Sequence, residues 1–166
     1  IFGLFGIFVW AFASTSNAMV SNIIGQGKKD KVEFLIKKIM LLSFGFTSLL
    51  CLLLNLFPDA FLSVFGRDNS FTAEPIPVIR IVSIGVLCMS VATVWLNAVT
   101  GTGNTKMNLF IEIIAITLYS IYIWLVLKVW NLSLVWAWGS ELLYWVVLFT
   151  LSFLYIRSGK WKKKII

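Results

Sequence analysis

Histidine is absent from the sequence, and proline and cysteine are rare, with three and two residues among 166. Without histidine, the chain has no Ser-His-Asp triad, no Cys-His pair and no histidine-ligated metal site. Both cysteines, Cys51 and Cys88, lie within apolar runs, where an unpaired cysteine packs as a small apolar side chain. We therefore expect two buried free thiols, no metal site, no cofactor and no enzymatic activity.

Charged residues are also scarce. They make up 13% of the chain, whereas apolar residues make up 60%. A soluble domain is typically about 45–50% apolar and about 25% charged. A folded soluble chain of this length buries only about 70% of the surface it exposes when unfolded, too little to cover so much apolar surface. The composition therefore predicts a protein that lies in a lipid bilayer.

Five apolar runs are long enough to cross a bilayer, because a transmembrane helix needs about 20 apolar residues. They cover residues 1–24, 34–56, 78–99, 107–129 and 134–156, and a basic tail at 157–166 follows. The chain is thus predicted to be an all-α, polytopic membrane helix bundle. Ile1 already lies inside the first span, so we expect a fragment of a longer protein. Between the second and third spans, Phe57–Phe65 is half apolar and is expected to lie along the membrane surface.

Basic residues alternate between the segments that connect these spans. The first connection, the third connection and the tail carry all fourteen lysines and arginines except Arg67, Arg80 and Lys128. The positive-inside rule places these three segments in the cytoplasm, with the N-terminus outside and the C-terminus inside. Their position beside apolar runs also argues against nucleic acid as the partner of a chain with net charge +7.

Polar residues inside the first and third spans form two helical stripes. Asn17 and Ser21 share a face with Ser14, Ala18 and Gly25 in the first span. In the third span, residues 83, 90 and 97 (Ser, Ser and Asn) are spaced by seven and return to nearly the same face. Such stripes either let helices pack closely and hydrogen-bond, or line an aqueous cavity. Asn17, Ser21, Ser90 and Asn97 are therefore candidates for lining a cavity, and helix packing is the alternative.

The fourth and fifth spans each contain one carboxylate. Glu112 shares a helical face with Asn108 and Tyr119, and Glu141 follows the apolar start of the last span. A carboxylate inside a bilayer is stabilised by protonation, by an ion pair or by water. Each glutamate is thus a candidate ion-coupling group. The alternative is a fixed partner: Lys106 for Glu112, and Arg80 or Lys128 for Glu141.

Two stretches resemble the multidrug and toxic-compound extrusion (MATE) transporters. Residues 13–29, ASTSNAMVSNIIGQGKK, look like the second helix of a lobe and the basic turn after it. Residues 97–105, NAVTGTGNT, and the following MNLFIEII look like the tenth helix, its turn and the eleventh helix. The resemblance covers nearly the whole chain and implies helices eight to twelve of a twelve-helix, two-lobe protein.

This resemblance implies a secondary active transporter that exports drug-like compounds or organic cations while Na⁺ or H⁺ flows inward. It implies three partners: a small-molecule substrate, the missing N-terminal lobe and the missing first helix of the C-terminal lobe. It also implies a multi-pass protein of the bacterial inner membrane. Many members carry an acid in the middle of the tenth helix, but the matching position here is near Met89, and residues 78–99 contain none.

Three other functions compete with drug export. A lipid-linked sugar flippase of the same superfamily would share the architecture, but its cavity is expected to hold more cationic residues for the phosphates. A membrane enzyme acting on lipids is disfavoured by the absence of histidine and of a close acid pair. A non-catalytic membrane assembly subunit is the remaining alternative, since five spans alone need not enclose a complete cavity.

Overall fold

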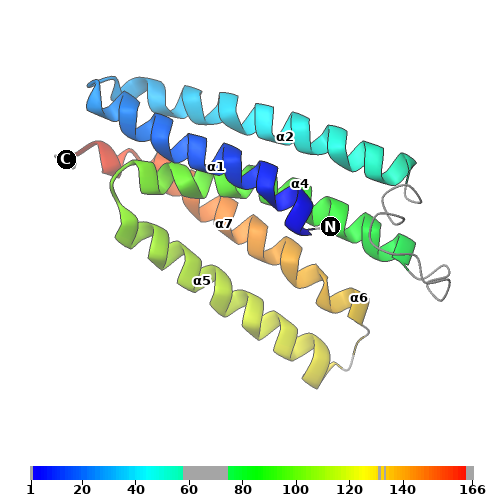
Figure 1. The fold of residues 1–166 in the computed structure, drawn as a ribbon. Helices are drawn as coiled ribbons and strands as arrows, with labels where there is room; N and C mark the ends of the chain where they lie inside the picture. Colours follow the sequence, from blue (N-terminus) through cyan, green and yellow to red (C-terminus); the bar gives the residue numbers. More distant parts are fainter. Residues whose placement is uncertain (1, 58–74, 131, 133, 164–166) are drawn as a thin grey trace.

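The computed structural model describes residues 2–57, 75–130, 132 and 134–163, and every element in these ranges is helical. Five long helices run up and down beside one another (Figure 1). They are α1 (Phe2–Gly25), α2 (Val32–Leu56), α4 (Pro75–Gly101), α5 (Thr105–Trp124) and α7 (Gly139–Arg157). The short elements are η1 (Lys29–Lys31), the π-helical turn η2 (Leu125–Val129), α6 (Leu134–Ala137) and η3 (Lys160–Lys163).

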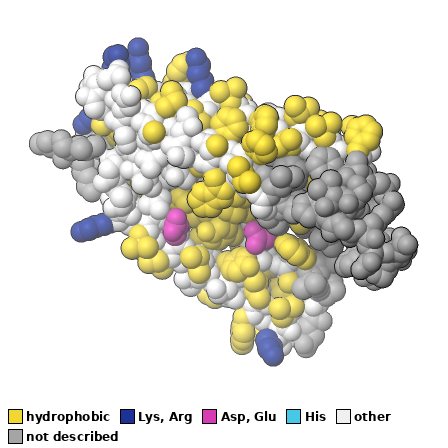
Figure 2. All heavy atoms as spheres, in the orientation of Figure 1, with side chains coloured by type: hydrophobic (Ala, Val, Ile, Leu, Met, Phe, Trp, Pro, Cys, Tyr) yellow, Lys and Arg dark blue, Asp and Glu magenta, His cyan; other side chains and the backbone are white. Residues whose placement is uncertain are grey.

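All five predicted spans correspond to helices that are long and apolar enough to cross a membrane. The all-α membrane architecture is therefore confirmed. The basic connections and the tail gather at one end of the bundle, where Figure 2 shows most of the lysine and arginine side chains. Which side of the membrane this end faces stays a prediction. The predicted surface segment Phe57–Phe65 lies outside the described residues apart from Phe57.

Helix α4 is the centre of the bundle. It contacts α1, α2 and α7 along its length and α5 more sparsely. Within its apolar window, 72% of the residues are buried, against 17–28% for the other four spans. Trp95 is its largest buried side chain, 1% exposed, and meets the rings of Phe149 and Phe153 at 6.1 and 5.1 Å between centroids. Its indole Nε1 donates to the sulfur of Met40 at 3.1 Å, so one side chain joins three helices.

Serine hydroxyls attach α1 and α2 to the backbone of α4. Ser16 Oγ of α1 donates to the Val94 carbonyl at 2.9 Å, and Ser43 Oγ of α2 donates to the Ser90 carbonyl at 3.2 Å. Near the basic end, Ser21 Oγ donates to the Gly101 carbonyl at 3.0 Å. Small hydroxyl residues allow this close approach and satisfy their own polar groups across the helix interface.

The turn between α1 and η1 is made by glycine. Gly27 has a φ of 73°, a left-handed conformation that glycine adopts without a steric penalty. Its amide donates to the Ile24 carbonyl at 2.9 Å, and the next amide, of Lys28, donates to the Ile23 carbonyl at 3.1 Å. These bonds satisfy carbonyls at the end of α1 and turn the chain toward α2.

The predicted span 134–156 is divided into α6 and α7 at Trp138. The amide of Glu141 bonds to the Trp138 carbonyl at 3.2 Å, three residues back instead of four. The Ser140 hydroxyl takes the carbonyl of Ala137 at 2.6 Å in place of a backbone amide. A local side-chain bond thus competes with the regular helix and ends α6.

Lysine and tryptophan side chains join the α1–α2 turn to the C-terminal turn, a contact called the terminal clasp below. Lys162 Nζ lies 2.6 Å from an Asp30 carboxylate oxygen, and Lys29 Nζ donates to the Lys162 carbonyl at 2.9 Å. Trp161 is 3% exposed, belongs to the main core, and donates Nε1 to the Ile156 carbonyl at 2.8 Å. The clasp therefore closes the basic end of the bundle between η1 and η3.

Helix α5 lies apart from the rest of the bundle and contacts mainly α7 (Figure 1). At the basic end, Asn104 caps α5 by accepting from the Met107 amide, and its Nδ2 donates to Tyr155 Oη of α7 at 2.7 Å. At the other end, the amide of Trp130 bonds to the Leu125 carbonyl at 2.9 Å, five residues back, which forms the π-helical turn. The two helices are thus fixed near the basic end and diverge from α1.

Candidate functional site

A groove of about 360 Å³ lies between α5 and α7. Three residues of α5 and three of α7 line it: Ile116, Tyr119, Ser120, Glu141, Tyr144 and Trp145. Its walls are largely aromatic and its charged group is a carboxylate. Figure 2 shows two acidic side chains on the face of the molecule beside α5, with hydrophobic side chains around them.

Three aromatic rings form a continuous chain across the groove. Tyr119 of α5 meets Tyr144 of α7 edge to face, with 6.0 Å between ring centroids. Tyr144 in turn meets Trp145 edge to face at 4.8 Å. In this geometry the positive edge of one ring meets the negative face of the next, so the rings fix one another's orientation. The indole Nε1 of Trp145 is buried and has no hydrogen-bond partner among the described residues.

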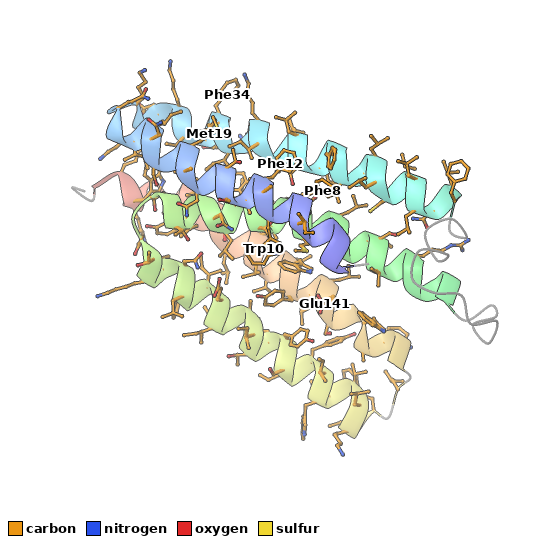
Figure 3. All side chains as sticks on the ribbon, in the orientation of Figure 1. Phe8, Trp10, Phe12, Met19, Phe34 and Glu141 are labelled. Carbon is orange, nitrogen blue, oxygen red and sulfur yellow. The ribbon has the colours of Figure 1, made fainter. Side chains whose placement is uncertain are left out.

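Glu141 enters the groove from the first turn of α7. Figure 3 shows it on the side of α7 that faces α5. Unpaired backbone amides at a helix start give that end a partial positive charge, which stabilises a nearby carboxylate. The break at Trp138 therefore creates a helix start that places and stabilises Glu141.

Glu112 lies on α5, two turns closer to the basic end than Tyr119, and is partly exposed. Asn108 Nδ2 donates to Glu112 Oε1 at 3.2 Å, so the shared face predicted for these residues is present. The other amide atom, Asn108 Oδ1, is buried and has no partner among the described residues. Both glutamates lie close enough to Tyr144 for their charges to act on its hydroxyl group.

Neither glutamate forms an ion pair with a described basic residue. In the described ranges, the ion pairs join Glu33 to Lys37 at 2.8 Å and Asp30 to Lys162. The proposed fixed partners Lys106, Arg80 and Lys128 are exposed and do not contact these carboxylates. The arrangement favours carboxylates that remain available to a mobile cation over permanent ion pairs.

The predicted stripe on α1 does not coincide with its packed face. Ser14 and Ala18 are exposed, and Asn17 is half-buried. Ser21 is largely exposed but donates to α4. The buried face carries Val9, Ala13, Ser16, Val20 and Ile24 instead. Most of the stripe thus remains open to another helix or a cavity, and Ser16 supplies the packing bond.

The predicted stripe on α4 is used for packing. Ser90 is fully buried, and its hydroxyl donates to the Leu87 carbonyl at 2.8 Å. Ser83 is buried and accepts from Asn55 Nδ2 of α2 at 3.0 Å. Asn97 is half-buried and donates to the Thr93 carbonyl one turn back at 3.0 Å. These contacts favour helix packing for Ser83 and Ser90, and none of the four residues lines the groove between α5 and α7.

Ile116 and Ser120 are groove residues that the sequence analysis did not identify. They follow Glu112 by four and eight residues, so a helical face drawn through Glu112 and Tyr119 would have included them. Tyr144 and Trp145 are neighbours of Glu141 on α7, but nothing in the sequence shows that Tyr119 meets them from α5.

Comparisons with known proteins give one family and one relative. The chain matches the MatE family over residues 1–126. It is 25% identical over 149 residues to the "Probable multidrug resistance protein NorM" of Thermotoga maritima, a match that covers 89% of this chain and 32% of that protein. The chain therefore spans about a third of the length of this curated relative. No solved structure matches the chain.

Proposed function

The chain belongs to the MatE family, and from this premise we propose that it forms part of a cation-coupled antiporter. The transporter would export organic cations or related drug-like compounds across the bacterial cytoplasmic membrane while Na⁺ or H⁺ moves inward. Two features support this proposal: the relative in Thermotoga maritima bears the name of a multidrug resistance protein, and five helices suit a membrane-spanning lobe. The remaining partners would be an N-terminal lobe and the first helix of the C-terminal lobe.

The observation that carries the proposal is a carboxylate within an aromatic groove that holds no basic residue. A cation is attracted by the negative face of an aromatic ring, and most strongly where water is excluded. Glu141 adds a full negative charge beside Tyr119, Tyr144 and Trp145. The volume of about 360 Å³ falls within the usual range for small-molecule sites, about 300–1,000 Å³.

Glu112 is the proposed coupling carboxylate. Its partner Asn108 donates to one carboxylate oxygen and leaves the other able to accept a proton or to contact Na⁺. Because the charges of Glu112 and Glu141 both act on Tyr144, neutralising one carboxylate weakens the attraction of the same region for a second cation. Competition of this kind between a coupling ion and an organic cation is what antiport requires.

The flippase alternative is less well supported by the groove. Lipid-linked sugars carry phosphates, which call for lysine or arginine in the binding region. The residues that line the groove include neither, and the basic residues of the described chain lie mainly at one end of the bundle (Figure 2). A membrane assembly subunit would not need an exposed carboxylate in an aromatic groove.

The test is efflux of a cationic dye from proteoliposomes that contain the intact transporter, with an imposed Na⁺ or H⁺ gradient. We expect Glu112→Gln to lower the initial rate per molecule at least tenfold, because glutamine keeps the shape and polarity but cannot carry the coupling charge. Glu141→Gln should weaken dye binding, with a smaller effect on the rate at saturating dye. Glu33→Gln is the matched control, since Glu33 already pairs with Lys37 at the surface.

A normal rate per molecule in the Glu112→Gln protein would refute the coupling role. Loss of folded protein in the membrane, with a normal rate for the molecules that remain, would show that Glu112 is structural.

A further inference from the structure

The outward face of α2 combines two lysines with a long apolar stripe. Lys31, Phe34 and Lys38 are exposed and follow one another at helical spacing at the basic end. Beyond them the same face continues with exposed leucines at positions 41, 42, 49, 52 and 56. The opposite face of α2, from Val32 to Leu54, packs into the bundle. Figure 3 shows Phe34 on the outward side of the helix.

The Lys38 side chain is directed back toward the start of α2. Its Nζ lies 4.6 Å from the centroid of the Phe34 ring, although its own Cα is one helical turn deeper. A lysine at a membrane edge extends its charged group toward the polar surface while its methylene chain stays on apolar surface. The contact with the ring adds a cation–π attraction that holds the ammonium group on this face.

The acidic residues at this end are already paired with other lysines. Glu33 pairs with Lys37 at 2.8 Å, and Asp30 pairs with Lys162 at 2.6 Å. Among the described residues, neither Lys31 nor Lys38 forms an ion pair. Two uncompensated positive charges therefore lie on one helical face, directly above apolar surface.

We propose that this face is a binding site for one anionic phospholipid. The phosphate and the anionic headgroup lie between the ammonium groups of Lys31 and Lys38, and the acyl chains follow the leucines of α2. Basic residues beside a membrane span attract anionic lipid by roughly fivefold in affinity for each lysine, which is about 1 kcal/mol each. A zwitterionic lipid carries its own ammonium group and gains much less from the two lysines. The site is independent of dye export, because it lies on α2 and the groove lies between α5 and α7.

The experiment measures phosphatidylglycerol bound to the intact protein, by native mass spectrometry after exchange into detergent, with phosphatidylcholine as the reference lipid. We expect preferential binding of phosphatidylglycerol, and we expect Lys31→Gln/Lys38→Gln to lower that affinity by roughly 30-fold. The matched control is Lys106→Gln/Lys160→Gln, which removes the same charge from other exposed positions at the same end. The control should change the affinity by less than about threefold.

Equal losses in the two double variants would overturn the proposal, since they would show a diffuse charge effect and no local site. Equal binding of the two lipids by the unmodified protein would overturn it as well. A soluble polyanion, heparin, separates the remaining possibility. If heparin binding falls in Lys31→Gln/Lys38→Gln while phosphatidylglycerol binding does not, the face serves a soluble acidic partner and the lipid proposal is wrong.

Discussion

Gly101→Ala tests the closest contact between α1 and α4. A β-carbon at this position would lie 2.7 Å from the Asn17 carbonyl oxygen and 3.0 Å from the Val20 β-carbon. The nearer atom belongs to the backbone and cannot rotate away, so the two helices must separate. Overpacking of this kind destabilises a folded protein by about 1–3 kcal/mol.

Two smaller effects accompany the clash at Gly101. Separation weakens the bond from Ser21 Oγ to the Gly101 carbonyl, now 3.0 Å, and interhelical bonds in membrane proteins contribute about 0.6 kcal/mol on average. Alanine recovers about 0.5–1 kcal/mol through its higher helix propensity. The net expected loss is about 1–2.5 kcal/mol, which corresponds to a thermal midpoint lower by roughly 2–10 °C.

The assay is thermal unfolding of the intact protein in detergent micelles. Gly45→Ala is the matched control, because Gly45 lies inside α2 and no atom is within 4 Å of a β-carbon built there. The control should be as stable as the unmodified protein or slightly more stable. If Gly101→Ala unfolds at the same temperature as Gly45→Ala, the close approach of α1 and α4 is not present in the protein.

Two further predictions concern the core and the terminal clasp. Trp95→Ala should destabilise the protein by about 3–5 kcal/mol and lower the thermal midpoint by roughly 10 °C or more, since it leaves a cavity at the centre of the bundle; an unchanged midpoint would contradict the central position of Trp95. The Lys162 ammonium lowers the pKa of the Asp30 carboxyl below its ordinary value of 3.8. Because the folded-state pKa is the lower one, the stabilisation is complete above pH 3.8 and disappears as the pH falls through the lowered value. Hydrogen exchange at the Lys162 amide should therefore be constant from pH 5 to 8 after correction for intrinsic rates, and severalfold faster in Asp30→Asn; equal exchange in both proteins would show that the clasp is not formed.

Hydropathy alone predicted the number of spans and most of their ends. That success follows from physics, because a bilayer requires a minimum apolar length and helical backbone bonding. It did not predict that span 134–156 divides at Trp138. The division depends on the Ser140 hydroxyl replacing a backbone donor, and a hydropathy window does not register one serine.

Helix faces were predicted less completely than helix positions. On α1, small and polar residues occupy more than one face, so periodicity could not show that Ser16 packs against α4 while Ser14 stays exposed. On α5, a single carboxylate defined the face, and Asn108 was correctly placed beside Glu112. The meeting of Tyr119 with Tyr144 depends on how α5 lies against α7, which no local pattern records.

The terminal clasp has a consequence for biosynthesis. Asp30 and Lys162 are 132 residues apart, and chains are made from the N-terminus at about 5–20 residues per second. The α1–α2 turn therefore waits roughly 7–26 s, on this rate, before its partner leaves the ribosome. During that interval Asp30 has no Lys162, and the core lacks Trp161. A nascent chain that terminates shortly after α7 would contain every span described here yet expose an open basic end, a difference by which membrane quality control can distinguish it from a finished chain.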